Sequence, residues 1–197
     1  MYKLGITGGM GSGKSTAANF FKLKGATIFD ADEESKRHLL SHIELQNRII
    51  DTFGPTVTKE GCLELSRLAK YVFPSKEYQL TLNQIIWPEI YVLIKSAADK
   101  EASNNTNLFV VDAALLLESG YKKYFDSILL ITAPKSIRIQ RIQLRNNIPE
   151  EQIKQRMALQ MPEIEKQKLT QMTIENDCGI RELHLKLEEF YKNLNIG

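Results

Sequence analysis

The chain has 197 residues, of which 43% are hydrophobic and 25% charged, and its 26 basic and 24 acidic side chains leave a formal net charge of +2. This ordinary composition excludes a wholly disordered chain, and the near-neutral charge argues against a dedicated nucleic-acid-binding protein. The length predicts one domain with an insertion, or two small domains. The 2 cysteines have no C-x-x-C spacing, which excludes a disulfide framework and a zinc knuckle.

Membrane and export signals are missing from the sequence. The first residues lack the long apolar run of a signal peptide. The most apolar stretch, residues 108–117, is interrupted by Asp112 and is too short to cross a bilayer, which takes about 18 or more apolar residues. We therefore expect a soluble cytoplasmic protein that associates with neither membrane nor nucleic acid.

Five short segments rich in β-branched or large apolar residues are predicted to be strands. They are residues 2–7, 27–29, 108–111, 127–132 and 172–174. Each precedes a stretch with helical spacing, and the runs at 108–111 and 128–131 are continuously apolar, as buried parallel strands are. The pattern predicts a three-layer α/β/α fold with a five-stranded, mostly parallel sheet.

The residues between the second and third predicted strands form an insertion. Apolar faces with helical spacing run from residue 39 to 53, from 65 to 72 and from 78 to 86, and we expect Pro88 to interrupt the last helix. A simple crossover needs only about a dozen residues. We therefore predict a helical subdomain at residues 33–103, leaving a core of residues 1–32, 104–134 and 170–197.

Residues 135–169 form a second, strongly charged excursion. Arg138, Arg141 and Arg145 are spaced three and four apart, hence on one helix face, and residues 146–149 break the helix before a second one that contains Arg156. These arginines are either solvated charges or the cations of a hinged lid that closes over a phosphate and excludes water. An amphipathic packing helix is predicted at 180–194.

A phosphate-binding motif follows the first predicted strand. Residues 8–15, GGMGSGKS, match the P-loop pattern G-x-x-x-x-G-K-[ST] and open a helix. In such a loop successive backbone N–H groups and the helix N-terminus surround the phosphates. Lys14 is then expected to reach the β- and γ-phosphates and Ser15 to bind Mg²⁺.

Carboxylates follow two of the predicted strands. Asp112 directly follows 108–111, while Asp30 and Asp32 follow 27–29, at the strand ends where ligands of open α/β sheets bind. A carboxylate there positions the metal or accepts a proton from an attacking hydroxyl. The pattern leaves open whether Asp112 or Asp30 positions Mg²⁺, and whether either simply caps a helix.

These motifs together resemble the dephospho-coenzyme A kinase family, nearly from end to end. The family patterns G-[LI]-T-G-G-[IM]-G-S-G-K-S-T, D-A-D, D-x-P-L-L-[FY]-E and D-N-x-G correspond to residues 5–16, 30–32, 112–118 and 176–179. The arginines of 141–156, with Gln160, Met161 and Pro162, are similar to the family's lid. The resemblance implies transfer of phosphate from ATP to the ribose 3′-hydroxyl of dephospho-coenzyme A.

The resemblance also implies roles for individual residues. Asp32 becomes the general base, Lys14 stabilises the transferred phosphate, and Arg141 is a catalytic lid residue in contact with ATP. Ser15 becomes the metal ligand, and we expect Asp112 from the strand-end pattern to be the carboxylate beside it. The ATP site comprises Gly9, Gly11, Ser12, Gly13, Lys14, Ser15, Thr16, Arg141 and Asn176. The acceptor site comprises Asp30, Asp32, Leu115, Leu116 and Glu118.

Three positions depart from the family pattern. Trp87 stands where the family usually has histidine, Leu65 where it has arginine, and Ala114 where it has proline. The first two lie in the insertion expected to bind the acceptor, so another small acceptor, such as a nucleoside, stays an alternative. A guanine-nucleotide switch is disfavoured because no N-K-x-D occurs, and a nucleic-acid ATPase because the charge is near neutral. We expect a monomer.

Overall fold

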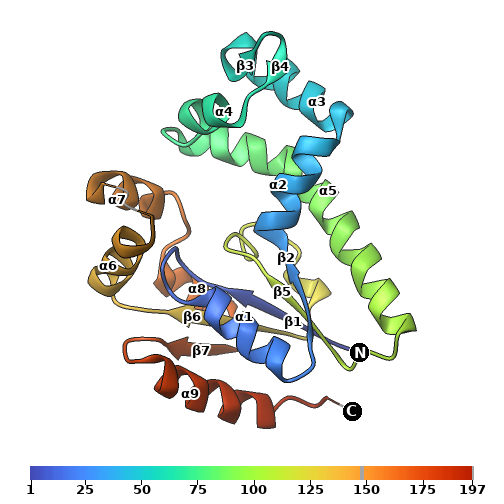
Figure 1. The fold of residues 1–197 in the computed structure, drawn as a ribbon, viewed down its shortest axis with the longest axis vertical. Coiled ribbons are helices and arrows are strands. Elements are labelled where there is room, and N and C mark those ends of the chain that lie inside the picture. The colour runs from blue at the N-terminus through green and yellow to red at the C-terminus, as the bar shows by residue number, and fades with distance from the viewer. Residues whose placement is uncertain (147–148, 197) are drawn as a thin grey trace. The chain divides into compact units, whose positions relative to one another are not determined.

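The computed structural model describes residues 1–146 and 149–196 and contains both strands and helices (Figure 1). In chain order they are β1 (Tyr2–Thr7), α1 (Lys14–Leu23), β2 (Thr27–Asp30), α2 (Ala31–Ser41), α3 (Ile43–Phe53), the 3-10 turn η1 (Pro55–Val57), β3 (Thr58–Lys59), β4 (Cys62–Leu63), α4 (Leu65–Val72), α5 (Lys76–Ser103), β5 (Leu108–Asp112), the 3-10 turn η2 (Lys122–Tyr124), β6 (Ser127–Thr132), α6 (Lys135–Asn146), α7 (Glu150–Ala158), α8 (Glu163–Leu169), β7 (Met172–Glu175) and α9 (Ile180–Lys192). The chain divides into two compact units, one made of Met1–Ala31 and the chain from Ile94 onward, the other of Asp32–Leu93.

The first unit is built on a five-stranded parallel sheet in the order β2-β5-β1-β6-β7. This confirms the predicted fold class. Strands β1 and β6 occupy the predicted residues, and the other three end one residue later than predicted. Every residue of β5 and β6 is buried, because helices or connecting segments cover both faces of a parallel sheet.

Helices α1 and α9 cover one face of this sheet (Figure 1). Phe21 of α1 and Leu187 of α9 share a core with Leu4 and Ile131 of the sheet. The stripe predicted on the C-terminal helix is therefore confirmed. On the opposite face, Gly5 allows Leu116 to approach, since an added Cβ would lie 2.8 Å from Leu116 Cδ1.

The second unit has its own apolar core. Its buried members come from α2, α3, η1 and α4 and are Leu39, Leu45, Ile49, Phe53, Val57, Leu68 and Val72. Between η1 and α4 the chain forms a short hairpin, β3–β4, turned by Glu60 (φ 53°) and Gly61 (φ 81°). Two consecutive positive φ angles are typical of a tight hairpin turn. The prediction of an almost wholly helical insertion missed this hairpin, because each strand has only 2 residues.

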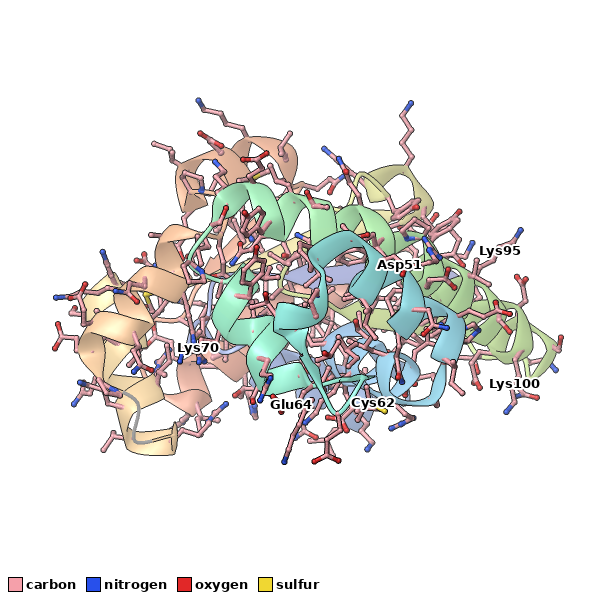
Figure 2. The ribbon with its side chains drawn as sticks, turned by 90° about the horizontal axis from the view of Figure 1, so that it is seen from above. Asp51, Cys62, Glu64, Lys70, Lys95 and Lys100 are labelled. Carbon is pink, nitrogen blue, oxygen red and sulfur yellow. The ribbon has the colours of Figure 1, made fainter. Side chains whose placement is uncertain are left out.

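The hairpin leads directly into a capped helix. The Glu64 carboxylate accepts hydrogen bonds from the backbone N–H groups of Ser66 (3.2 Å) and Arg67 (2.9 Å). The side-chain hydrogen bond from Ser66, followed by these backbone bonds, lowers the pKa of Glu64. Figure 2 marks Glu64 at the start of this helix and the exposed Cys62 on the preceding strand. The N-cap fixes where α4 begins.

The expected interruption at Pro88 is wrong, because α5 runs through it for 28 residues. Proline removes one helical hydrogen bond and crowds the preceding turn, at a cost of about 3 kcal/mol. The helix is held on both sides of this defect. Ile85 and Ile86 pack against the core of the second unit, and Ile90, Ile94 and Ala98 are almost completely buried after it. Burial of these side chains offsets the local cost.

The charged excursion forms three helices, α6, α7 and α8. Helices α6 and α7 were predicted, whereas α8 was not. Of the break predicted at residues 146–149, residues 147–148 lie outside the described part of the chain. Ile139, Ile142 and Ile153 join α6 to α7, with Met10 of the P-loop packed against them. Among all helices described, none combines the length and the apolar composition needed to span a membrane.

Candidate active site

The P-loop connects the end of β1 to the start of α1. Gly11 (φ 79°) and Gly13 (φ 104°) adopt left-handed backbone conformations that favour glycine. A side chain at Gly11 would also approach the Arg138 carbonyl, and one at Gly13 would collide with the amide of Asn176. Gly13 takes the N-cap position of α1 without a side-chain cap, so N–H groups of the first turn remain available to an anion.

Asn176 is hydrogen-bonded to the P-loop and to the segments next to it. Its Nδ2 donates a buried hydrogen bond to the Ser12 carbonyl (2.8 Å), while its backbone N–H donates to the Thr132 carbonyl at the end of β6 (2.7 Å). Its Oδ1 accepts a hydrogen bond from Arg141 Nη2 at 3.4 Å. Asn176 thus joins the phosphate loop and an arginine of α6 through its side chain, and a strand end through its backbone.

A cavity of about 670 Å³ opens in front of this loop. It is lined by seven of the residues predicted for ATP: Gly11, Gly13, Lys14, Ser15, Thr16, Arg141 and Asn176. Gly9 and Ser12 do not line it. The lining also includes Arg145 and residues that sequence reasoning missed: Met10, Ile142, Leu144, Cys178, Gly179, Ile180 and Leu183. Their apolar side chains give the cavity a region suited to a flat base beside its cationic region.

The three arginines of α6 separate into two groups. Arg141 and Arg145 line the cavity, but Arg138 is buried behind the loop, 3.3 Å from Glu163 Oε1. Its guanidinium occupies the space that a side chain at Gly9 would need. The three arginines predicted to share a helix face therefore differ in their surroundings: Arg138 supports the P-loop, whereas Arg141 and Arg145 face the cavity.

Two predicted carboxylates meet at the carboxyl edge of the sheet. Asp112 ends β5 and Asp30 ends β2, and they are partners in the register of these neighbouring parallel strands. Asp112 is also in register with Ile6, just before the P-loop. Asp112 is buried, whereas Asp30 and the Ser15 hydroxyl are exposed. Hydroxyl and carboxylate oxygens are ligands that Mg²⁺ prefers, so this donor set fits that ion.

The remaining predicted acceptor residues lie on α2 and on the segment after β5. Asp32 is exposed in the first turn of α2, where a negative charge also favours the helix dipole. Leu116 is buried, while Leu115 and Glu118 are partly exposed. Glu118 Oε1 accepts a hydrogen bond from the Met161 N–H (3.1 Å) and lies 3.0 Å from Lys166 Nζ. Sequence reasoning missed Lys166, because a lysine in a charged helix is normally solvated.

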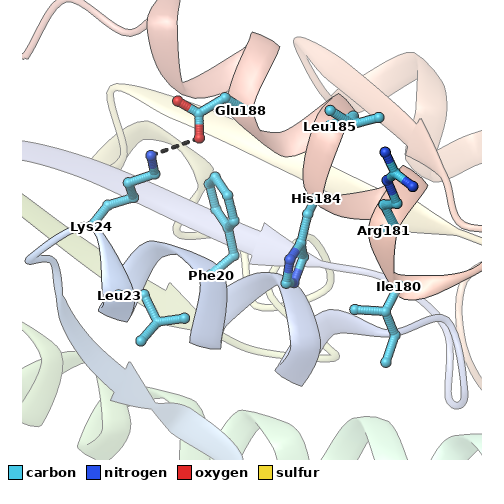
Figure 3. Close-up of a pocket in the computed structure, with 8 residues that line it drawn as sticks. All are labelled: Phe20, Leu23, Lys24, Ile180, Arg181, His184, Leu185 and Glu188. Carbon is cyan, nitrogen blue, oxygen red and sulfur yellow. Dashed lines mark ion pairs between the residues drawn. The ribbon is translucent and has the colours of Figure 1, made fainter.

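A second cavity, of about 750 Å³, lies between α1 and α9 (Figure 3). Lys24 and Glu188 form an ion pair across it at 2.6 Å, and the His184 ring lies 5.5 Å from that of Phe20. It shares only Ile180 with the lining of the first cavity and contains no P-loop residue. P-loop residues therefore line the first cavity and not this one.

Known proteins resemble this chain over nearly its whole length. A sequence model of the family described as dephospho-CoA kinase matches residues 2–182. A dephospho-CoA kinase of Salinibacter ruber is 32% identical over 192 residues, which are 97% of this chain and 96% of that one. A crystal structure from Thermus thermophilus has a TM-score of 0.80 at 28% identity, covering 98% of both chains. A dephospho-CoA kinase structure from Campylobacter jejuni has a TM-score of 0.66 at 24% identity, covering 96% of this chain and 95% of that one.

Proposed function

Because the chain belongs to the dephospho-CoA kinase family, we propose that it transfers the γ-phosphate of ATP to the ribose 3′-hydroxyl of dephospho-coenzyme A. The products are coenzyme A and ADP, so this is the last step of coenzyme A synthesis. The chain is a kinase with a nucleotide co-substrate. The observation that carries the proposal is that Lys14, Arg141 and Asn176 line the same cavity as glycines of the P-loop.

The nucleotide site supplies positively charged groups and backbone donors. The P-loop N–H groups would hold the phosphates, and Lys14 would stabilise the charge on the transferring group. Arg141 and Arg145 would approach the same phosphates from α6. The apolar part of the cavity would receive the base. Closure of the α6–α7 segment would exclude water, which protects the γ-phosphate from hydrolysis.

The metal site follows from the oxygen donors of Ser15 and Asp112. We assign these two residues as the holders of Mg²⁺, directly or through water, because Asp112 lies beside the strand that leads into the P-loop. When bound, the ion neutralises charge on the β- and γ-phosphate oxygens. Asp30, one strand further from the P-loop, is left to the acceptor.

The acceptor is activated by a carboxylate. Asp32 accepts the proton of the 3′-hydroxyl as that oxygen bonds to the γ-phosphorus. The bond between the γ-phosphorus and the β–γ bridging oxygen breaks, and its electron pair leaves with ADP. Asp30, Leu115, Leu116 and Glu118 complete the proposed acceptor site.

We also propose that the enzyme works as a monomer in the cytoplasm, which sedimentation and cell fractionation would test.

The decisive experiment measures transfer to dephospho-coenzyme A with Mg-ATP, in the wild type and in Asp32→Asn. Loss of a general base should lower kcat about 10²–10⁴-fold. Glu33→Gln, an exposed carboxylate one position further along α2, is the matched control and should retain activity. ATP affinity, measured by calorimetry, should be unchanged in both variants.

Three results would contradict this proposal. Full activity of Asp32→Asn would remove the assignment of the base. Turnover of a nucleoside in preference to dephospho-coenzyme A would refute the acceptor. ATP binding without transfer to either acceptor would instead identify a nucleotide-binding switch.

A further inference from the structure

Lys166 of α8 is completely buried, with an exposed fraction of 0%. Its Nζ lies 3.0 Å from Glu118 Oε1 and donates a hydrogen bond to the Ala114 carbonyl, also at 3.0 Å. Burial lowers the pKa of Lys166, and the charge of Glu118 opposes that change. A lysine is rarely buried unless it is paired, so this side chain needs both partners.

Both partners belong to the segment that follows β5, and that segment is bonded to the end of β1. The Ala114 carbonyl also accepts a hydrogen bond from Thr7 Oγ1 (3.3 Å), and the Ala113 N–H donates to the Ile6 carbonyl (3.0 Å). Thr7 is the last residue before the P-loop. Lys166 therefore adds a bond to a carbonyl that already joins residues 113–118 to the start of the phosphate loop.

The same carboxylate connects this segment to the residues before α8. Glu118 Oε1 accepts a hydrogen bond from the Met161 N–H, and the neighbouring Gln160 side chain accepts one from the Met10 N–H of the P-loop (3.0 Å). Lys14 is close enough that its charge contributes to the lowered pKa of Lys166. Lys166 thus lies where residues 113–118, residues 160–166 and the P-loop are joined.

We propose that Lys166 is a positioning residue for phosphoryl transfer, which holds residues 113–118 in place beside the P-loop through Glu118 and the Ala114 carbonyl. The inference rests on the proposed function, in which this segment binds the acceptor. Lys166 has no exposed surface, so it acts through its two partners and not by touching either substrate. The proposal also implies that Glu118 acts mainly through Lys166, because Glu118 Oε1, which accepts the hydrogen bond from the Met161 N–H, is also the oxygen that pairs with Lys166.

A structural ion pair and a positioning residue have different kinetic signatures. Loss of a purely structural pair lowers stability but leaves the folded fraction active. Displacement of the acceptor segment instead lowers kcat/KM for the acceptor, while the affinity for ATP stays unchanged. A misplacement of about 1 Å between reacting groups can cost about 10²-fold in rate.

The test uses Lys166→Met, Glu118→Gln and the double variant, with Lys168→Met as a matched control. Lys168 is exposed two residues further along α8 and should behave as wild type. We expect kcat/KM for the acceptor to fall about 10²-fold in Lys166→Met. The Kd for ATP should stay within about threefold, which is less than the tenfold change that 1.4 kcal/mol produces. The double variant, which buries no unpaired charge, should recover thermal stability but be no more active than Lys166→Met.

Four outcomes would overturn the inference. They are wild-type acceptor kinetics in folded Lys166→Met, recovery of activity together with stability in the double variant, an equal loss in Lys168→Met, and independent, multiplying effects of the two single substitutions. If Lys166→Met does not fold, the double variant decides. The acceptor assayed is the one that the wild type phosphorylates, so failure on dephospho-coenzyme A would refute the proposed function alone.

Discussion

Replacing Asn176 by alanine tests how the P-loop is held. The substitution removes the buried hydrogen bond from Asn176 Nδ2 to the Ser12 carbonyl (2.8 Å) and the oxygen that accepts from Arg141 (3.4 Å). It keeps the backbone N–H that pairs with Thr132. The Ser12 carbonyl then loses this buried donor, and Arg141 loses a partner that orients it.

The expected cost follows from these two contacts. Leaving a buried acceptor without its donor costs about 1–3 kcal/mol, and the longer bond to Arg141 adds little. For a protein of this size, each kcal/mol lowers Tm by about 2–4 °C, so the drop should be about 2–12 °C. This energy holds the loop in its phosphate-binding shape, so ATP should bind more weakly by up to about 5-fold to 150-fold, the equivalent of the full cost of about 1–3 kcal/mol.

Thermal unfolding and calorimetric titration with ATP measure the two effects on the same preparation. Asn193→Ala, which removes an exposed amide at the end of α9, is the matched control and should change neither quantity. Asn176→Asp sharpens the test, because its carboxylate faces the Ser12 carbonyl without a proton to donate. It should weaken ATP binding at least as much as alanine does. Wild-type Tm and ATP affinity in Asn176→Ala would refute the idea that this amide supports the loop.

Two further predictions concern Lys14 and Cys178. Lys14→Ala should lower kcat about 10²–10³-fold, since it removes a preorganised cation at the transferring group. Lys22→Ala on the same helix should have no effect, and a loss below threefold in Lys14→Ala would contradict the role. The pKa of the Cys178 thiol is raised from 9.0 to about 11, first by its hydrogen bond to Glu182 and then by Asp177. The thiol is therefore mostly protonated below that pH, and alkylation by iodoacetamide, followed by mass spectrometry, should keep accelerating up to about pH 11 and level off above it. Glu182→Gln should shift this profile to lower pH, and half-maximal reactivity below pH 9 in the wild type would contradict the assignment.

The sheet and the phosphate loop were predictable because their signals are local. Residues 108–111 and 128–131 are continuously apolar, and the glycine loop follows directly after the strand at residues 2–7. The P-loop needs its glycines because its own backbone adopts conformations that favour glycine, such as the φ of 104° at Gly13. Local signals were misleading at Pro88, where burial of side chains on both sides outweighs the proline's preference to end a helix.

Pairings between distant residues were not predictable from the sequence. Arg138 and Arg141 look alike in the sequence, three positions apart on one helix face. Only the fold shows that Arg138 meets Glu163 and that Arg141 meets Asn176. Lys166 and Glu118 are 48 positions apart in the sequence, and no residue near either of them indicates that they form an ion pair.

These pairings determine which cations are available to a triphosphate. Arg138 and Lys166 are neutralised by Glu163 and Glu118 inside the first unit. Within residues 1–146 and 149–196, Lys14, Arg141 and Arg145 form no ion pair with a carboxylate, and all three line the nucleotide cavity. In the proposed function these three cations bind the triphosphate in a chain whose net charge is only +2, because low-dielectric surroundings strengthen the field of nearby charges. In the proposed function, Glu118 and Glu163 therefore influence nucleotide binding indirectly, because they pair with two cations and leave Lys14, Arg141 and Arg145 for the phosphates.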